Sequence, residues 1–196
     1  MTGRPRSAQA DDAIVDATLA LLGEQGFDRV SMDAVAARAG VARATIYRRW
    51  PSKEALVIDA VARRTDPFPD AVTGPIRDQL VSILDGILAV SRTGAGRLLP
   101  CMVGATVSNP PLAEHYRAQI LEPRRARMRH LVRNAVAHGE LRRGVDVDDA
   151  IDLLLGALLY RLVFAGPDAV DDGEPARLVD AALKGLAPTS PPASGS

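Results

Sequence analysis

The segment from Ser31 to Trp50 constrains the fold of this chain more than any other. Ser31 can accept a hydrogen bond from a free backbone N–H group in the first turn of a helix, and Asp33 suits the positive end of the helix dipole. Gly40, which follows an alanine-rich stretch, can adopt the left-handed conformation that ends a helix abruptly. The segment is therefore predicted to form two short helices joined by a sharp turn.

The second of these helices is predicted to have an apolar inner face and a polar outer face. Val41 and Ile46 are expected to pack against the first helix, where Val35 and Ala39 lie one turn apart. Residues 38–53 contain five basic residues and no acidic one. A compact two-helix corner with an exposed basic second helix fits the major groove of DNA, so we interpret the segment as a helix-turn-helix. The residues left facing outward are Arg43, Ala44, Thr45, Tyr47 and Arg48.

An ordinary helical hairpin with a solvated basic face is the alternative interpretation of the same segment. It accounts equally well for Val35, Gly40, Val41 and Ile46, because packing and turn residues are needed in both cases. It does not explain why small residues on the first helix occur together with a second helix that lacks acids and carries a tyrosine.

The segment also resembles a known family, and the resemblance extends over nearly the whole chain. The order of a polar arm, an amphipathic helix and this helix-turn-helix is similar to the TetR family of bacterial transcriptional regulators. Ala42 stands where the family often has serine, so the second helix is expected to lack a side-chain N-cap. Trp50 replaces the more common phenylalanine and keeps its apolar role. The matching pattern, Gly-Val-x-x-x-Thr-hydrophobic-Tyr-x-x-aromatic-x-x-Lys-x-x-Leu, consists here of Gly40, Val41, Thr45, Ile46, Tyr47, Trp50, Lys53 and Leu56.

Double-stranded operator DNA is the partner that this interpretation predicts. Arg43 could bond to O6 and N7 of one guanine, and Thr45 could contact a thymine methyl group or donate to a base. The resemblance implies that Tyr47 and Lys53 contact phosphates and that Ser31 grips the backbone. Arg4 and Arg6, on a polar arm, could enter a minor groove. The predicted DNA-binding residues are Ser31, Arg43, Ala44, Thr45, Tyr47, Arg48, Arg49 and Lys53.

Helical periodicity dominates the rest of the chain, which predicts an all-α fold of about nine or ten helices. Pro100 and Pro123 each predict a kink or a break nearby. The predicted parts are a flexible arm (1–9), a DNA-binding domain (10–55), a ligand-binding and dimerisation domain (56–186) and a disordered tail (187–196). Expected helices include 10–25, 76–91, 94–107, 111–122, 123–138, 147–164 and 174–186.

Composition narrows the possible classes of protein. The chain has 196 residues, 47% of them hydrophobic, and a formal net charge of zero, so any affinity for nucleic acid must come from local charge. A single cysteine, Cys101, excludes an internal disulfide and suits a reducing cytoplasm. The most apolar run, 153–165, is too short for a bilayer and contains Arg161, so no membrane span or membrane partner is expected. No signal peptide is expected either.

A single small DNA-binding module makes few contacts, so specific binding requires two half-sites roughly 34–36 Å apart and predicts a homodimer. The two last predicted helices carry leucine-rich faces that resemble the family's four-helix dimer interface, and Gly156 and Ala157 would permit a close approach. An intramolecular core is the alternative for the same residues. The predicted interface consists of Ile151, Leu154, Leu155, Leu158, Leu159, Leu162, Leu178, Val179, Ala182, Leu183 and Leu186.

In the TetR family the larger helical body binds a small molecule that alters the separation of the two DNA-binding heads. Met and aromatic side chains suit adaptable apolar pockets, although each residue chosen here would also suit an ordinary core. The predicted ligand-binding residues are Leu99, Met102, Val103, Thr106, His115, Tyr116, Ile120, Tyr160 and Phe164.

Other polar clusters are interpreted without a site. His130 and His138 make a poor metal site, and no metal or cofactor is predicted. The arginine-rich stretch 124–133 is expected to be a solvated helix partly paired with acids, and the aspartates within 146–152 suit a helix start but lack the order of a calcium loop.

The sequence thus predicts a repressor that a small-molecule inducer releases from its operator. An activator or a ligand-independent DNA-binding regulator would use the same residues. A small-molecule-binding or enzymatic helical protein with a vestigial DNA-binding head is a more remote alternative. Because the sequence contains no Gly-x-Ser-x-Gly motif, phosphate-binding loop, paired histidine ligands or Cys-His arrangement, an enzyme is not predicted.

Overall fold

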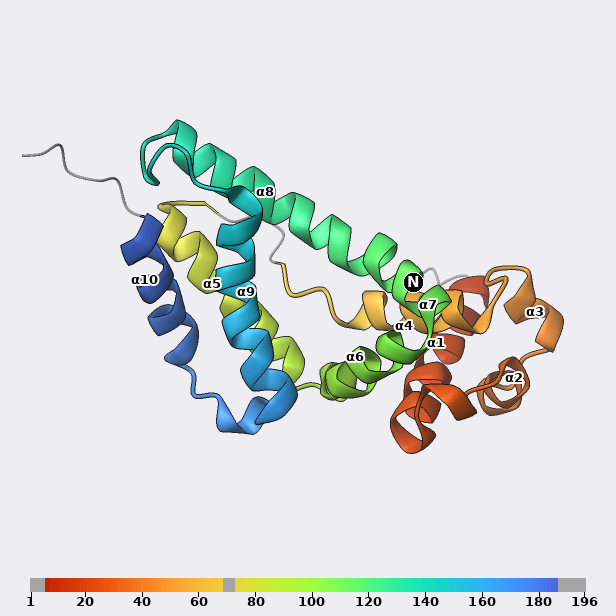
Figure 1. Cartoon of the computed structure of the whole chain (residues 1–196). Helices are drawn as coiled ribbons and strands as arrows, with labels where there is room; N and C mark the ends of the chain where they lie inside the picture. The colour runs from red at the N-terminus through yellow and green to blue at the C-terminus, as the bar shows by residue number, and fades with distance from the viewer. Residues whose placement is uncertain (1–5, 69–72, 187–196) are drawn as a thin grey trace, which may run out of the picture. The chain divides into compact units, whose positions relative to one another are not determined.

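The structure, a computed structural model, describes residues 6–68 and 73–186. Throughout these residues all regular structure is helical, which confirms the predicted all-α fold (Figure 1). The α-helices of the described residues are α1 (Arg6–Gln25), α2 (Met32–Ala39), α3 (Arg43–Tyr47), α4 (Lys53–Arg64), α5 (Ile76–Ser91), α6 (Leu99–Ser108), α7 (Pro110–Tyr116), α8 (Glu122–Ala137), α9 (Val147–Phe164) and α10 (Glu174–Leu186). Short 3₁₀ turns, η1 (Phe27–Arg29), η2 (Gly96–Leu98) and η4 (Pro167–Ala169), and a π turn, η3 (Arg117–Leu121), complete them.

The chain divides into two compact units, and each unit is built from two separate stretches of sequence. Residues 6–9, predicted to belong to a flexible arm, instead form the start of α1. Residues 1–5, including Arg4, and the predicted tail 187–196 lie outside the described residues. The first unit comprises Met1–Asp66 and Gly94–Glu122, and the second comprises Pro67–Thr93 and Pro123–Ser196. The two predicted folded domains, 10–55 and 56–186, were instead separated by a single cut after residue 55.

Helix ends in the first unit follow the local sequence signals. The Ser31 hydroxyl accepts a hydrogen bond from the Ala34 amide at 3.2 Å at the start of α2, and Gly40 ends this helix with a φ of 66°. Ser52 accepts from the Ala55 amide at 3.1 Å at the start of α4. Helix α3 begins after Ala42 without a side-chain cap, as predicted.

The core of the first unit forms where α1, α2 and α4 pack together, with α6 and α7 contributing from the second stretch of sequence. Ile14, Ile46 and Leu56 have no exposed surface. Leu112 of α7 is equally buried in the same cluster. Packing of such side chains is the main stabilisation available to this unit, because burial of a large aliphatic side chain contributes about 1.5–3 kcal/mol.

The two prolines predicted to disturb helices have different effects. Pro100 lies in the first turn of α6, where backbone N–H groups have no acceptor within the helix. The missing N–H group of proline therefore costs no helical hydrogen bond there. Pro123 comes just after η3, so the helical backbone changes to the wider π geometry before the proline and continues into α8. The structure therefore has a π turn at the place where the sequence predicted a kink or a break.

The second unit packs α5, α9 and α10 against one another, with α8 beside them (Figure 1). The observed bounds of these three packed helices match the predicted ranges 76–91, 147–164 and 174–186. The Glu140 carboxylate accepts a hydrogen bond of 2.7 Å from the Ile76 amide and so caps α5, whose preceding residue, Pro75, offers no side-chain acceptor. The core side chains include Leu80, Ile83, Leu84, Ile151, Leu154, Leu158, Leu162 and Val179.

Gly86 allows the chain between α4 and α5 to lie directly against α5. A Cβ atom at Gly86 would lie 2.1 Å from the backbone oxygen of Pro67. We expect Gly86→Ala to lower the free energy of unfolding by about 1–3 kcal/mol, because the overlap with backbone outweighs the better helix propensity of alanine. Thermal and urea unfolding followed by circular dichroism would measure it.

Gly104→Ala is the matched control, because a Cβ atom there would meet no described atom within 4 Å. This variant should be neutral or up to about 1 kcal/mol more stable. Equal effects of the two substitutions would contradict the role given to Gly86.

Candidate nucleic-acid interface

Helix α3 has only five residues and is held by its inner face. Ile46 is fully buried, and the Val41 amide donates to the Ala36 carbonyl at 3.1 Å across the turn. Thr45 is half-buried, and Tyr47 keeps 41% of its surface exposed. Together with the exposed Arg43, Ala44 and Arg48, these residues form the outer face of α3. The inner and outer faces therefore divide as the sequence predicted.

Arg43, the first residue of α3, makes contacts with both helices of the corner. Its Nη1 atom lies 2.9 Å from Oδ1 and 3.1 Å from Oδ2 of Asp33 in α2. Its Nη2 atom donates to the Tyr47 hydroxyl at 3.1 Å, with the guanidinium carbon 5.1 Å from the centre of the Tyr47 ring. The hydrogen bond to Tyr47 and the charge of Asp33 raise the pKa of Arg43, so this arginine stays cationic.

Two other predicted DNA contacts have partners within the first unit. Arg49 forms an ion pair with Asp11 of α1, and both side chains are largely buried. Lys53 donates to the carbonyls of Phe27 at 3.1 Å and Asp28 at 3.4 Å, and its ammonium lies 4.3 Å from the centre of the Phe27 ring. Binding of either cation to phosphate stays a prediction and would require these contacts to change.

The remaining predicted DNA contacts lie at the surface. Arg48 forms no ion pair with any residue that the structure describes. The Ser31 hydroxyl accepts from α2 and keeps its own O–H group to donate. Trp50 is buried, as predicted, and its Nε1 atom donates to Asp59 at 2.8 Å. The face available to DNA thus consists of the outer face of α3 together with the start of α2.

The predicted ligand-binding residues are distributed over both units. Met102 and Ile120 are buried in the core of the first unit, and the other predicted residues of that unit, Leu99, Val103, Thr106, His115 and Tyr116, are half-buried or exposed. Tyr160 and Phe164 belong to α9 of the second unit, where their exposed fractions are 66% and 75%. Ligand binding by this set stays a prediction.

Each unit has a cleft of its own. A cleft of about 600 Å³ in the first unit is lined by His115, Trp50, Arg49 and Asp11 among others. Another of about 420 Å³ in the second unit is lined by His130, His138 and Glu140 among others. Of the predicted ligand-binding set, these two clefts include only His115. Within the described parts of the chain, no three His, Cys, Asp or Glu side chains gather as a metal site.

The predicted dimer interface turns out to contain two kinds of residue. Five residues, Ile151, Leu154, Leu158, Leu162 and Val179, are buried inside the second unit. They therefore belong to the intramolecular core, which was the alternative for these positions. Leu155, Leu159, Leu178, Ala182 and Leu183 are half-buried, and the side chain of Leu186 lies outside those described.

The opposite side of α9 carries an exposed apolar face that the sequence analysis missed. Leu153 is 63% exposed, and the rings of Tyr160 and Phe164 follow it at helical spacing, with their centres 4.9 Å apart. The leucine-rich composition on all sides of α9 hid this face, because hydrophobicity alone did not distinguish the buried side from the exposed side. We call Leu153, Tyr160 and Phe164 the outer α9 face.

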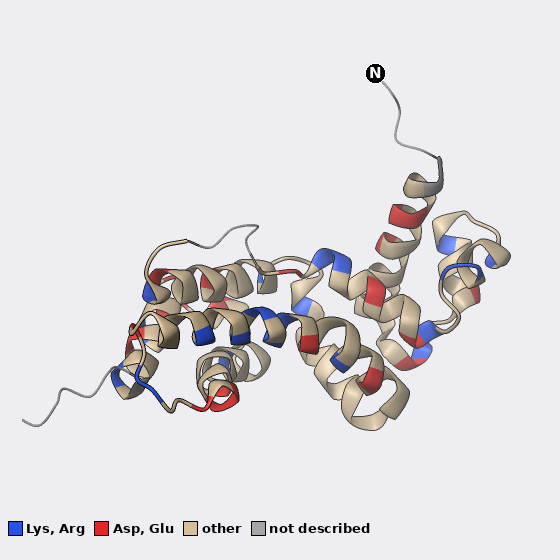
Figure 2. Ribbon diagram, turned by 90° about the horizontal axis from the view of Figure 1, so that it is seen from above, with Lys and Arg blue, Asp and Glu red and all other residues tan. Residues whose placement is uncertain are grey.

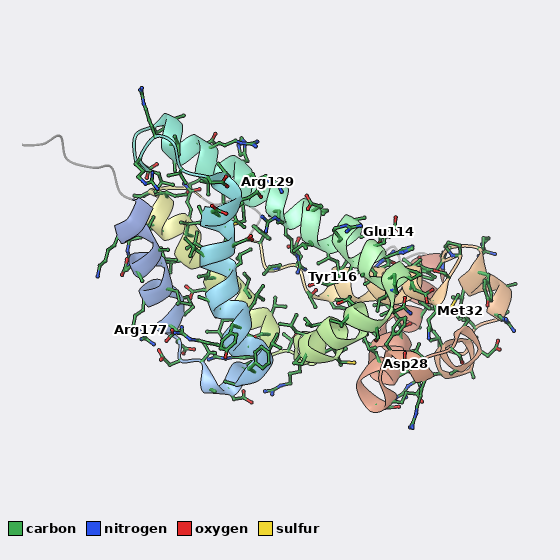
Figure 3. The ribbon with its side chains drawn as sticks, viewed as in Figure 1. Asp28, Met32, Glu114, Tyr116, Arg129 and Arg177 are labelled. Carbon is green, nitrogen blue, oxygen red and sulfur yellow. The ribbon has the colours of Figure 1, made fainter. Side chains whose placement is uncertain are left out.

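The arginine-rich helix is α8, and its basic residues are visible along it in Figure 2. Arg125 bonds to Asp148 at 2.7 Å and also pairs with Asp152. The Nε atom of Arg129, which is labelled in Figure 3, lies 2.9 Å from Asp148. The arginine run and the aspartate run therefore pair with each other between α8 and α9. The Asp146 carboxylate accepts from the Asp148 and Asp149 amides and caps α9, as expected of a helix start.

Known proteins are similar to this chain both in sequence and in fold. Residues 14–60 match the family described as bacterial regulatory proteins, tetR family, and residues 68–182 match the tetracyclin repressor-like C-terminal domain. The uncharacterized HTH-type transcriptional regulator YdeS of Bacillus subtilis is 36% identical over 96% of this chain and 95% of its own length. The DNA-binding transcriptional repressor TetR of Mycobacteroides abscessus is 33% identical over 92% of this chain and 93% of its own.

Among solved structures, the TetR family transcription regulator SCO0332 aligns with a TM-score of 0.69 and 34% identity, covering 92% of this chain and all of that one. The fold and the exposed α3 define a helix-turn-helix DNA-binding protein. The chain belongs to the TetR family of bacterial transcriptional regulators, as its sequence pattern predicted. None of the helices described here is long and apolar enough to cross a membrane.

The pairing between α8 and α9 predicts a dependence of stability on pH. Hydrogen bonds from Arg125 and Arg129 lower the pKa of Asp148 below its ordinary value. This carboxylate therefore stabilises the fold above its unfolded-state pKa, and the contribution is lost as pH falls through the lower folded-state pKa. We expect Asp148→Asn to be less stable than the wild type at pH 7, with a difference that shrinks as the pH falls through this acidic range.

Urea unfolding at a series of pH values would measure this difference. Asp149→Asn is the control, because Asp149 lies in the same helical turn and forms no ion pair with a described arginine. A loss of stability in Asp148→Asn that stays constant from pH 7 to pH 3 would contradict the prediction.

Proposed function

We propose that this regulator is a homodimeric repressor that binds a near-palindromic operator and is released by a small-molecule inducer. The observation that carries the proposal is the exposed outer face of α3, on a helix that the core holds in place. In this proposal Arg43, the first residue of α3, bonds to one guanine, and Tyr47 and Ser31 contact phosphates; the exposure of all three side chains supports these roles. Because its proposed partner is chromosomal DNA, we propose that the protein is located in the bacterial cytoplasm.

Repression is supported by the relative in Mycobacteroides abscessus, which is named a transcriptional repressor. An activator or a ligand-independent regulator would use the same DNA-binding residues, and only the position of the operator or the effect of a ligand on transcription separates these functions. We also propose that the chain is not an enzyme. A helical enzyme with a vestigial head would turn over a substrate and ignore DNA.

Homodimerisation is supported by the outer α9 face. Leu153, Tyr160 and Phe164 present large apolar surfaces to solvent, and such a face needs a partner. A second copy of the chain is the partner that DNA binding requires, because two heads in one dimer match two half-sites. The inducer would act by binding one arrangement of the dimer more tightly than the other, since only a difference in affinity shifts the population.

Selection from random duplexes, performed with the wild type and two variants, tests DNA binding. We expect the wild type to recover a motif with two-fold symmetry. Arg43→Ala should relax one base position in each half-site, at a cost of about 1–3 kcal/mol for that base. Tyr47→Phe, which removes only the hydroxyl, should weaken binding to all sequences alike. Recovery of no motif by the wild type would refute the proposed function.

Leu153→Glu tests the dimer. Leu153 is 63% exposed, so a charge there should leave the fold intact while opposing burial of the outer α9 face. We expect the variant to sediment as a monomer with an unchanged helical signal in circular dichroism. Val107→Glu is the control, because Val107 is 84% exposed on α6 in the first unit. A Leu153→Glu variant that stays dimeric would exclude this face as the interface.

A further inference from the structure

Asp33 is an acidic residue beside a surface that otherwise suits a polyanion. It lies in the first turn of α2, before the acid-free stretch 38–53, and its carboxylate holds Nη1 of Arg43 through both oxygen atoms, at 2.9 and 3.1 Å. The side chain of Asp33 is 66% exposed, and the side chain of Arg43 is 58% exposed. Because both groups are in contact with water, an external acceptor can replace the carboxylate at small cost.

The guanidinium group of Arg43 is bound by two residues at once. Asp33 takes Nη1, and the Tyr47 hydroxyl accepts from Nη2 at 3.1 Å. The arginine that is best placed to meet a base edge is thus already engaged within the helix-turn-helix. A phosphate oxygen that approaches Arg43 must compete with a carboxylate and also meets its negative charge. A guanine edge offers two acceptors without a full negative charge and therefore competes on better terms.

We propose that Asp33 is a specificity-determining residue that acts by positioning Arg43. The proposal rests on the proposed function and assigns one residue to its selectivity. On unrelated DNA, Arg43 stays with Asp33 and adds little to the phosphate attraction that dominates non-specific binding. On the operator, the base edge replaces Asp33 as the acceptor for Arg43. Asp33 lowers affinity for all DNA but lowers it most for the wrong DNA, which is how repulsive elements create specificity.

The chain offers a matched control in a second exposed pair of the same type. Arg38 near the end of α2 donates to Glu24 of α1 at 2.6 Å, and both side chains are about half exposed. Glu24→Gln and Asp33→Asn each remove one negative charge from the first unit and release one arginine. Only Asp33→Asn releases an arginine that belongs to α3.

The test compares Asp33→Asn, Glu24→Gln, Arg43→Ala and the double variant Asp33→Asn/Arg43→Ala. Fluorescence anisotropy would give the affinity of each for the selected duplex and for a shuffled duplex of the same composition, at several salt concentrations. We expect Asp33→Asn to bind the shuffled duplex roughly two- to fivefold more tightly and the selected duplex with a smaller gain, so that the specificity ratio falls. The affinity of Asp33→Asn for the shuffled duplex should also fall more steeply with salt concentration than that of the wild type.

The double variant decides whether the effect passes through Arg43. In the Arg43→Ala background, Asp33→Asn should leave the specificity ratio unchanged, and Glu24→Gln in the wild-type background should leave it unchanged as well. An unchanged or higher ratio for Asp33→Asn alone would overturn the proposal, as would the same fall of the ratio without Arg43. A wild-type protein that prefers no duplex would overturn the proposed function together with this inference.

Discussion

The burial of Ile46 is the interaction on which the rest of this protein depends. Helix α3 has five residues, far fewer than an isolated helix needs in water, so its position comes from packing and not from its own stability. Ile46 inserts into the core that α1, α2 and α4 share, and the left-handed Gly40 sets the direction of the chain just before it. Every side chain on the outer face of α3 is placed by this one anchor and this one turn.

The basic residues of the helix-turn-helix have two different roles in the first unit. Some bind neighbouring elements of the protein, and others remain exposed at the surface. Arg49 and Lys53 hold the end of α3 and the start of α4 to neighbouring elements, through Asp11 and through the carbonyls of Phe27 and Asp28. Arg43 and Arg48 remain at the surface. A chain with no net charge can still present a local cationic face, because residues 38–53 contain five basic residues and no acidic one.

The second unit shows how one helix can serve two surfaces. One side of α9 is buried against α5 and α10 through residues such as Leu158, while Leu153 and Phe164 on the other side remain exposed. Its start is tied to α8 by Arg125 and Asp148. These ion pairs are partly buried, because the side chain of Arg125 is 16% exposed and that of Asp148 is 51% exposed, and they join the start of α9 to α8.

The sequence alone determined the all-α fold, the cap at Ser31, the turn at Gly40 and the inner and outer faces of α3. These features depend on residues close together in the chain, so a periodic pattern or a capping residue is enough to predict them. Only the tertiary structure decided which arginines are engaged, which side of α9 is exposed, and how Pro123 is accommodated after a π turn. Ion pairs such as Arg43 with Asp33 and Arg49 with Asp11 join residues that lie far apart in the chain, and a helix as rich in leucine as α9 does not reveal its buried side until its neighbours are in place.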